Sequence, residues 1–366
     1  MPNDALTNLL ERVAIAEKIT AIKHEVAVDV THEFFRRHPD WKQRYGPAGF
    51  QRGLEDACYH LEYLAAAIEA GSTELFERYG SWTGRVLESR GIARRFVVEN
   101  LEQIEAQLQS RLEAAESAWT QPYFRAGMSA IGEPAAPLQH ETDVAASRQL
   151  FRTAILRGQR SGAVYIAEEA LSKAASAADV YIELFSKALW EVGELWERNQ
   201  ISVADEHRAT AIVQYVIAQM YSRVPLEPQE RGNVIVTGVE GEFHQLGGNI
   251  VADILEAEGW NVCFLGTNLP HGTILSKIQE HRAAAVCISA TMPFNVMNVR
   301  RLIADIRARF GRELLIVLGG QAFAAATAFF EQAGADAWAP DARVGVAILA
   351  EGVAARSRAC GPRSPE

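Results

Sequence analysis

The residues with the clearest potential for chemistry are Glu242, His244 and Gly247, which form the spacing Glu-x-His-x-x-Gly. They follow the apolar, β-branched run 234–239 and precede a helical pattern. A His can bind a metal through one ring nitrogen while a carboxylate holds the other N–H, and Glu242 is close enough in sequence to do so. In an open α/β sheet, ligands bind beyond the carboxyl ends of the strands. The three residues alone equally fit a polar loop with an incidental His.

Two further strand-like runs end in small residues. Ser289 and Thr291 follow the run 285–288, and Gly319 and Gly320 follow the run 314–318. Small residues at strand ends predict a slot in which backbone approaches a ligand closely. The three-part pattern over residues 231–355 resembles the cobalamin-binding domain family, whose motif is Asp-x-His-x-x-Gly, then Ser-x-Leu or Ser-x-Thr, then Gly-Gly. Glu242 replaces the usual Asp, which lengthens the side chain by one methylene.

The resemblance implies a role for each matching position. His244 would be the lower axial ligand of cobalt in place of the cofactor's own dimethylbenzimidazole, and the displaced tail would pass the small residues. The cobalamin contacts implied in this domain are Glu242, Phe243, His244, Gly247, Ser289, Thr291, Gly319 and Gly320.

The pattern around these residues predicts a domain over 230–355 in which strands and helices alternate. We expect strands near 233–239, 260–265, 284–289, 314–318 and 336–338, and helices near 247–258, 271–281, 293–309, 322–331 and 341–354. This alternation is typical of a doubly wound parallel sheet. Residues 356–366 are expected to form a disordered tail.

Four helical segments near 144–156, 163–177, 179–197 and 203–223 predict a four-helix bundle over 144–224. Trp196 would lie near Glu206 and His207 at one end of it, as a core Trp beside a solvated pair or as a cap on a flat macrocycle. The spacing Trp-x9-Glu-His resembles light-sensing proteins of the CarH type, in which the bundle covers the upper face of adenosylcobalamin. The resemblance implies that these three residues contact the adenosyl group. Glu197 stands where that type commonly has a second cobalt-ligating His.

Residues 1–120 read as an all-helical domain of bundle-like or globin-like packing, followed by a linker at 121–143 rich in Gly and Pro. One expected helix, 48–70, carries several polar and aromatic residues on neighbouring faces. They indicate an aromatic core with a satisfied His, a haem site ligated by His60, or a pocket for a porphyrin-derived ligand. The domain order and segment 55–63 resemble the photocobilins, which implies biliverdin contacts at Arg52, Asp56, Tyr59, His60, Tyr63 and Trp82.

Composition bounds the class of protein. The 366 residues are 48% hydrophobic and 22% charged, with a formal net charge of -10, which argues against a nucleic-acid partner. No signal sequence or membrane-spanning run is evident, and the four scattered cysteines suggest reduced thiols in a cytoplasmic protein.

These patterns lead to the hypothesis of a signalling photoreceptor that is not an enzyme. It would bind adenosylcobalamin and biliverdin, form a light-dependent homo-oligomer (a dimer or higher), and act on an unidentified output protein, without nucleic acid or membrane. Two alternatives stay open: a corrinoid methyl-carrier protein of a methyltransferase system, and a haem or cobalamin redox sensor.

Overall fold

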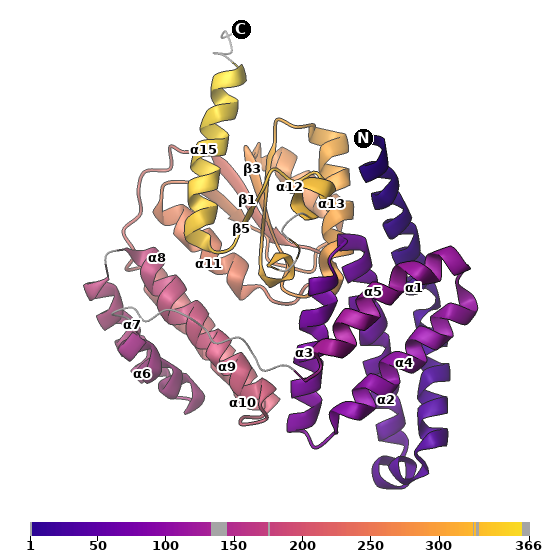
Figure 1. Cartoon of the computed structure of the whole chain (residues 1–366). Coiled ribbons are helices and arrows are strands. Elements are labelled where there is room, and N and C mark those ends of the chain that lie inside the picture. Colours follow the sequence, from indigo (N-terminus) through magenta and orange to yellow (C-terminus); the bar gives the residue numbers. More distant parts are fainter. Residues whose placement is uncertain (1, 133–144, 175, 325, 327–328, 361–366) are drawn as a thin grey trace. The chain divides into compact units, whose positions relative to one another are not determined.

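The computed structural model describes residues 2–132, 145–174, 176–324, 326 and 329–360 (Figure 1). It consists of two units, Met1–Ala136 and Pro137–Glu366, whose relative positions are not determined. None of the helices in these described ranges combines the length and apolar character that a membrane crossing requires.

The described part of the first unit is helical. Gly71, in the left-handed conformation at φ 66°, ends α2, and the Ser72 hydroxyl accepts the backbone N–H of Leu75 to cap α3. Gly46, at φ 57° and ψ -156°, kinks α2 just before Pro47. The helices are α1 (Pro2–Arg37), α2 (Pro39–Ala70), α3 (Thr73–Ser89), α4 (Arg94–Arg111) and α5 (Ala114–Ala130). A globin-like arrangement of these helices remains a prediction.

Helix α5 corrects the predicted linker, because it occupies the first ten residues of 121–143. A Cβ added at Gly80 of α3 would lie 2.2 Å from the Gly127 carbonyl oxygen of α5. Gly127 is therefore a close helix–helix contact and does not provide linker flexibility. Within the region 1–120, α4 ends at Arg111, and a capping box between Glu113 and Glu116 starts α5. Residues 133–144 of the predicted linker lie outside the described ones.

The second unit begins with the helical bundle. It contains α6 (Ala145–Leu156), α7 (Arg160–Lys173), α8 (Ala177–Asp179), η1 (Val180–Ser186), α9 (Lys187–Glu197) and α10 (Val203–Tyr221). The predicted segment 179–197 is one continuous run, but its first part, η1, is a π-helix. Ser202 and Asp205 form a capping box that starts α10.

The bundle is followed by a five-stranded parallel sheet in the order β2-β1-β3-β4-β5, as the alternating pattern predicts. Helices α11 and α15 pack on one face of the sheet, where Leu255 and Leu349 join its core, and α12 and α13 cover the other face (Figure 1). The strands are β1 (Asn233–Gly238), β2 (Asn261–Phe264), β3 (Ala285–Ser289), β4 (Leu315–Gly319) and β5 (Ala337–Ala339). The connecting elements are α11 (Leu246–Ala257), α12 (His271–His281), η2 (Pro293–Asn295), α13 (Val296–Phe310), η3 (Gln321–Phe323), α14 (Phe329–Ala333) and α15 (Ala342–Cys360).

The C-terminal end differs from the prediction of a disordered tail over 356–366. Helix α15 continues to Cys360, so residues 356–360 are helical. The Arg356 guanidinium pairs with Asp336 at 2.8 Å, which ties this part of the helix to the residue just before β5. Residues 361–366 lie outside the described ones.

Candidate functional site

The turn after β1 places a buried carboxylate against the His244 ring. Glu242 is fully buried, and its Oε1 atom accepts the backbone N–H groups of Phe243 at 3.0 Å and His244 at 2.9 Å. The same oxygen lies 2.6 Å from His244 Nδ1. An ionised carboxylate only accepts hydrogen bonds, so Nδ1 carries a proton, and in its neutral form the ring presents a lone pair at Nε2. The pair is thus arranged as a carboxylate–histidine metal ligand.

The second carboxylate oxygen links this turn to the loop after β3. Glu242 Oε2 accepts the backbone N–H groups of Thr291 at 2.8 Å and Met292 at 3.2 Å, and the Asn295 amide at 3.0 Å. Burial raises the pKa of Glu242, but the hydrogen bonds from His244, Thr291 and Met292 outweigh it and hold the pKa at about 2. The longer arm of Glu, compared with Asp, is therefore satisfied across two loops.

Three asparagines that sequence reasoning missed brace the same turn. Asn268 accepts the backbone N–H of Gly241 at 3.0 Å, and the Asn298 amide donates to the Glu240 carbonyl at 2.9 Å. Asn295 is buried and binds Glu242 directly. No spacing rule marks these residues, because they reach the turn from the loop after β2, from η2 and from the start of α13.

The His244 ring itself is open to a ligand. Its side chain is 55% exposed, and Nε2 has no hydrogen-bond partner among the described residues. The hydrogen bond to Glu242 raises the pKa of His244, burial opposes this, and the Glu206 carboxylate raises it further. Glu206 lies in the first turn of α10, so the structure brings this end of the bundle to the ligand loop. Phe243, between the two paired residues, is exposed.

Four small residues form a row across the carboxyl ends of the strands. Gly238, Ser289, Gly319 and Ala339 are successive neighbours in register on β1, β3, β4 and β5. The sequence singled out Ser289 and Gly319 as small residues at strand ends, whereas Gly238 and Ala339 emerge from the register. Large side chains are thus absent from this edge at these four positions, as a slot for a cofactor tail requires.

The glycines of the predicted motif differ in the space that a side chain would have at each position. A Cβ at Gly247 would meet nothing within 4 Å, and one at Gly319 would meet only the Ala339 carbonyl oxygen at 3.9 Å, so both leave room for a ligand. Gly320, at φ +101°, would place a Cβ 2.2 Å from the Ala290 carbonyl oxygen. This glycine permits the approach of two loops, so the Gly-Gly pair clears space at its first position only.

The bundle residues predicted to cover a cofactor lie at the α9–α10 junction. Trp196 is in the last turn of α9, while Glu206 and His207 are in the first turns of α10. Glu206 Oε2 lies 2.5 Å from His207 Nδ1, and its Oε1 accepts the Thr210 hydroxyl at 2.8 Å. Both oxygens of Glu206 are therefore oriented, and the exposed His207 ring is held at the solvent side.

The first unit brings together part of its predicted site. His60 is buried, and its Nδ1 lies 2.7 Å from the Tyr79 hydroxyl. Tyr63 stacks on Tyr79 with ring centroids 3.8 Å apart, and Trp82 lies 6.1 Å from the Tyr79 ring. Burial lowers the pKa of His60 to about 4, so the ring is neutral at pH 7. Arg52, Asp56 and Tyr59 are exposed on α2. This geometry is that of a packed aromatic cluster.

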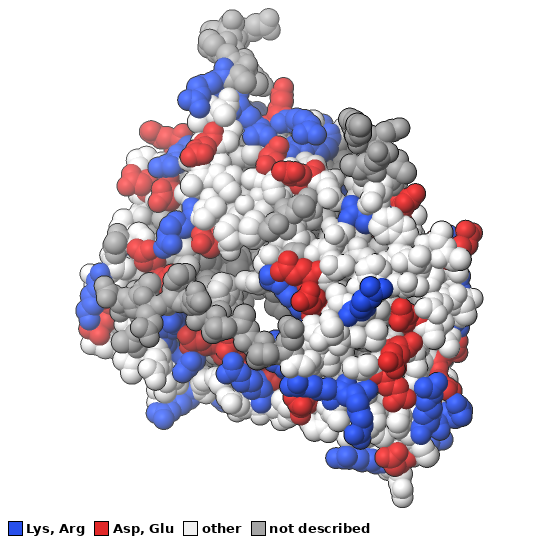
Figure 2. Space-filling view, in the orientation of Figure 1, with Lys and Arg blue, Asp and Glu red and all other residues white. Residues whose placement is uncertain are grey.

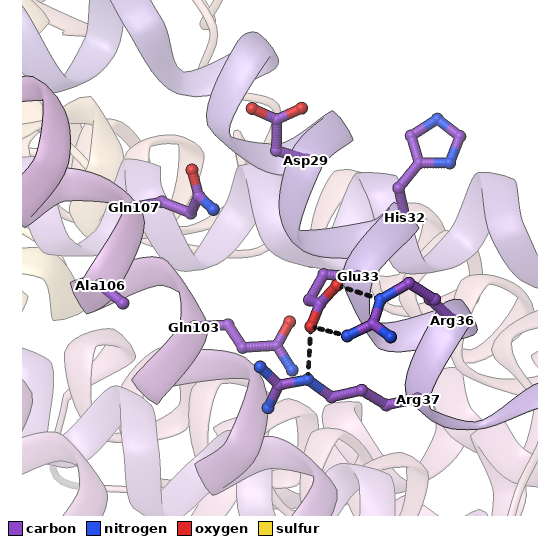
Figure 3. A pocket seen from close by; sticks show the side chains of 8 residues that line it. All are labelled: Asp29, His32, Glu33, Arg36, Arg37, Gln103, Ala106 and Gln107. Atoms are coloured by element: carbon purple, nitrogen blue, oxygen red, sulfur yellow. Dashed lines mark hydrogen bonds and ion pairs between the residues drawn. The ribbon is translucent and has the colours of Figure 1, made fainter.

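A polar groove of about 360 Å³ lies elsewhere in the first unit, between α1 and α4 (Figure 3). Both arginines that line it, Arg36 and Arg37, bind the Glu33 carboxylate, at 2.6 Å and 2.7 Å. The single Glu33 carboxylate therefore offsets one of these two positive charges within the groove. Figure 2 shows Lys and Arg side chains next to Asp and Glu side chains over the face in view.

Comparisons with known proteins agree with the second unit's geometry. A B12 binding domain model matches residues 232–347, and a second B12 binding domain model matches residues 148–221. Dimethylamine corrinoid protein 3 of Methanosarcina acetivorans is 28% identical over 167 residues, which cover 45% of this chain and 78% of that protein. Dimethylamine corrinoid protein 1 of Methanosarcina mazei is 26% identical over 194 residues, covering 52% and 89%.

Among solved structures, the Methanosarcina barkeri monomethylamine corrinoid protein has a TM-score of 0.51 and 20% identity. The match covers 57% of this chain and 99% of that one, and at this identity it shows the fold alone. Together with the two domain matches, these findings support a cobalamin-binding protein.

Proposed function

We propose that the second unit holds cobalamin with His244 as the lower axial ligand of cobalt. The observation that carries this proposal is the open Nε2 of His244, whose other ring nitrogen is fixed by a buried, ionised Glu242. Gly247 and Gly319, the latter in a row of small residues with Ser289 and Ala339, leave space for a displaced nucleotide tail. The residues present fit the cofactor that the domain matches imply.

The chain's own residues position the cofactor. Glu242 keeps the proton on Nδ1, so that the neutral ring offers Nε2 to the metal. The first turns of α10, with Glu206 and His207, would contact the cofactor from the bundle. A bound corrinoid supplies a cobalt–carbon bond, and the use that the protein makes of that bond distinguishes two functions.

The first candidate is methyl carriage for a methyltransferase system. Its support is the similarity to dimethylamine corrinoid proteins, which covers 45% and 52% of this chain. In this role the chain would be a substrate of partner enzymes. Full-length protein loaded with methylcobalamin should lose the methyl group to a suitable acceptor only when a partner methyltransferase is added.

The second candidate is light sensing through adenosylcobalamin, and the cap residues Trp196, Glu206 and His207 favour it. Further support is the N-terminal unit, which lies outside the two matched regions, 148–221 and 232–347. In this role that unit would hold biliverdin near the aromatic cluster of His60, Tyr63 and Trp82. Light would change the bundle's contacts and the oligomeric state, and an output protein would respond.

One experiment separates these functions. The full chain is loaded with adenosylcobalamin and biliverdin, and absorbance and molar mass are measured in the dark and after green light. Loss of the alkylcobalamin bands on illumination, weaker dark retention of the adenosyl group in Trp196→Ala and a separate red-absorbing bilin band would support light sensing. A light-stable spectrum without bilin uptake would support methyl carriage.

Two variants test the remaining assignments. A haem Soret band that is lost in His60→Ala would support the redox sensor. Normal cobalamin binding by His244→Ala would overturn the assigned ligand.

A further inference from the structure

A phenol and an imidazole form a buried pair in the first unit. His60 of α2 and Tyr79 of α3 are 4% and 5% exposed, and His60 Nδ1 lies 2.7 Å from the Tyr79 hydroxyl oxygen. A neutral imidazole has one donor and one acceptor nitrogen, and a buried O–H group requires an acceptor. The tautomer with an unprotonated Nδ1 provides this acceptor. Tyr79 therefore donates its phenolic proton to His60.

Two further aromatic rings connect this pair to the edge of the cluster. Tyr63 of α2 stacks on Tyr79, with ring centroids 3.8 Å apart and ring planes at 18°. The Trp82 ring of α3 lies 6.1 Å from the Tyr79 ring, and this indole is partly exposed. Tyr and Trp side chains can each lose one electron reversibly. The three rings thus form a chain of oxidisable groups that leads from a partly exposed indole to a buried hydroxyl.

The surroundings of Tyr79 keep its proton in place until an electron leaves. Burial raises the pKa of Tyr79 well above its ordinary value, and the nearby Thr83 hydroxyl opposes this. The phenol therefore does not ionise by itself near pH 7. A phenol that has lost an electron is a far stronger acid, so even a ring with a pKa lowered by burial to about 4, as in His60, accepts its proton.

Thr83 offers a hydrogen bond to the oxidised form. It lies one helical turn after Tyr79 on the same face of α3, and its buried hydroxyl makes no hydrogen bond in the described structure. A phenoxyl oxygen only accepts hydrogen bonds. Once the proton has moved to His60, the Thr83 hydroxyl can donate to the Tyr79 oxygen, so the oxidised state satisfies a buried group that lacks a partner in the resting state.

We propose that Tyr79 is a redox-active tyrosine that receives an oxidising equivalent through Trp82. A strong one-electron oxidant in solution, of the class of oxygen-centred radicals, takes one electron from the indole. The oxidised indole then takes one electron from Tyr79, while the phenol O–H bond breaks and an N–H bond forms at His60 Nδ1. The products are the reduced oxidant, a restored Trp82, a neutral Tyr79 radical and a His60 imidazolium.

The test is flash oxidation of the full chain, without cobalamin or bilin, by tris(bipyridine)ruthenium(III). Electron paramagnetic resonance and transient absorbance should detect a neutral tyrosyl radical that outlives those of exposed tyrosines, because burial prevents its reaction with a second molecule. Tyr79→Phe should lose the long-lived signal. Tyr59→Phe, at an exposed position of α2, is the matched control and should keep it. Tyr63→Phe retains the stacked ring and should also keep it.

Two further variants test the proton acceptor and the entry route. His60→Gln preserves a hydrogen-bond acceptor that cannot hold the proton, so the radical should form about a hundredfold more slowly. Radical formation should be slower in heavy water in the wild type, because a proton moves with the electron. Trp82→Phe, at a partly exposed position, should slow the oxidation of Tyr79 without disturbing the core.

A long-lived radical in Tyr79→Phe would overturn the proposal. So would formation at the wild-type rate in His60→Gln or in Trp82→Phe, each with its helical content intact by circular dichroism. Because neither cobalamin nor bilin is added, these results are independent of the proposed function.

Discussion

At the residue scale, Glu242 combines complete burial with complete hydrogen bonding. Its two oxygens accept from the backbone N–H groups of Phe243, His244, Thr291 and Met292, and from the side chains of His244 and Asn295. A neutral amide in its place would turn an NH₂ group toward donors and leave buried groups unsatisfied. The carboxylate therefore joins the two loops as well as orienting the His244 ring.

Glu242→Gln should lower the free energy of unfolding by about 2–4 kcal/mol, because breaking a buried charged network leaves its donors unpaired. It should also weaken cobalamin binding, because the proton on Nδ1 is no longer fixed. Urea unfolding and a cobalamin titration measure the two effects. Glu240→Gln, at an exposed position of the same turn, is the matched control and should change neither by more than about 0.5 kcal/mol.

The low pKa of Glu242 makes a separate prediction about acid stability. A carboxyl group with a depressed folded-state pKa contributes stability above its unfolded pKa and loses it as the pH falls through the folded value, here between about 4.5 and 2. The full contribution is roughly 3 kcal/mol for a shift of this size. The decline in unfolding free energy from pH 5 to pH 3 should be visibly smaller in Glu242→Gln than in the wild type, and parallel curves would refute this assignment.

At the element scale, local signals were sufficient for most boundaries. The apolar runs predicted the strands of the parallel sheet, and the helical patterns predicted most of the helices, because this periodicity acts within a few residues. The same reasoning failed for α5, since Gly127 serves a contact with α3 that only the packed structure contains. It also missed Asn295, which reaches Glu242 from 53 residues away. Long-range contacts leave no spacing signal.

The first turns of α10 carry Glu206 and His207. The stability of this end of the helix should depend on its N-terminal capping box. Ser202 Oγ accepts the Asp205 backbone N–H at 3.2 Å, and the Asp205 carboxylate accepts the Ser202 backbone N–H at 3.1 Å. Ser202→Ala should cost about 1 kcal/mol in urea unfolding. Ser222→Ala, at the other end of the helix, should cost much less, and equal losses in the two variants would show that the capping box is not the cause.

A substitution at Gly320 tests the close approach of the loops after β3 and β4. Gly320→Ala should destabilise the chain by about 3 kcal/mol or more, since it combines backbone strain with a steric clash against Ala290. Gly266→Ala is the control, because Gly266 also has a positive φ, of +75°, but its Cβ would lie 3.8 Å from the nearest side-chain atom. The control should lose only the strain, about 1 kcal/mol. Similar thermal unfolding of both variants would contradict the steric argument.

At the scale of the whole molecule, the two units divide the proposed chemistry. Every residue that contacts Glu242 or His244 in the described structure belongs to the second unit, and so do the small-residue row and the cap residues Trp196 and Glu206. The first unit has a separate set of helices and its own buried aromatic cluster. Cobalamin binding should therefore not depend on the first unit.

A fragment of residues 137–366 should bind hydroxocobalamin within about threefold of the full chain, a difference below about 1 kcal/mol, because it retains the complete ligand set. The fragment 1–136 should not bind it. Binding is measured by absorbance titration, and His244→Ala in the fragment provides the control for specific ligation. A loss of more than tenfold in the fragment, with its helical content intact by circular dichroism, would mean that the first unit supplies contacts to the cofactor. Retained affinity would show that the second unit is sufficient for cofactor binding.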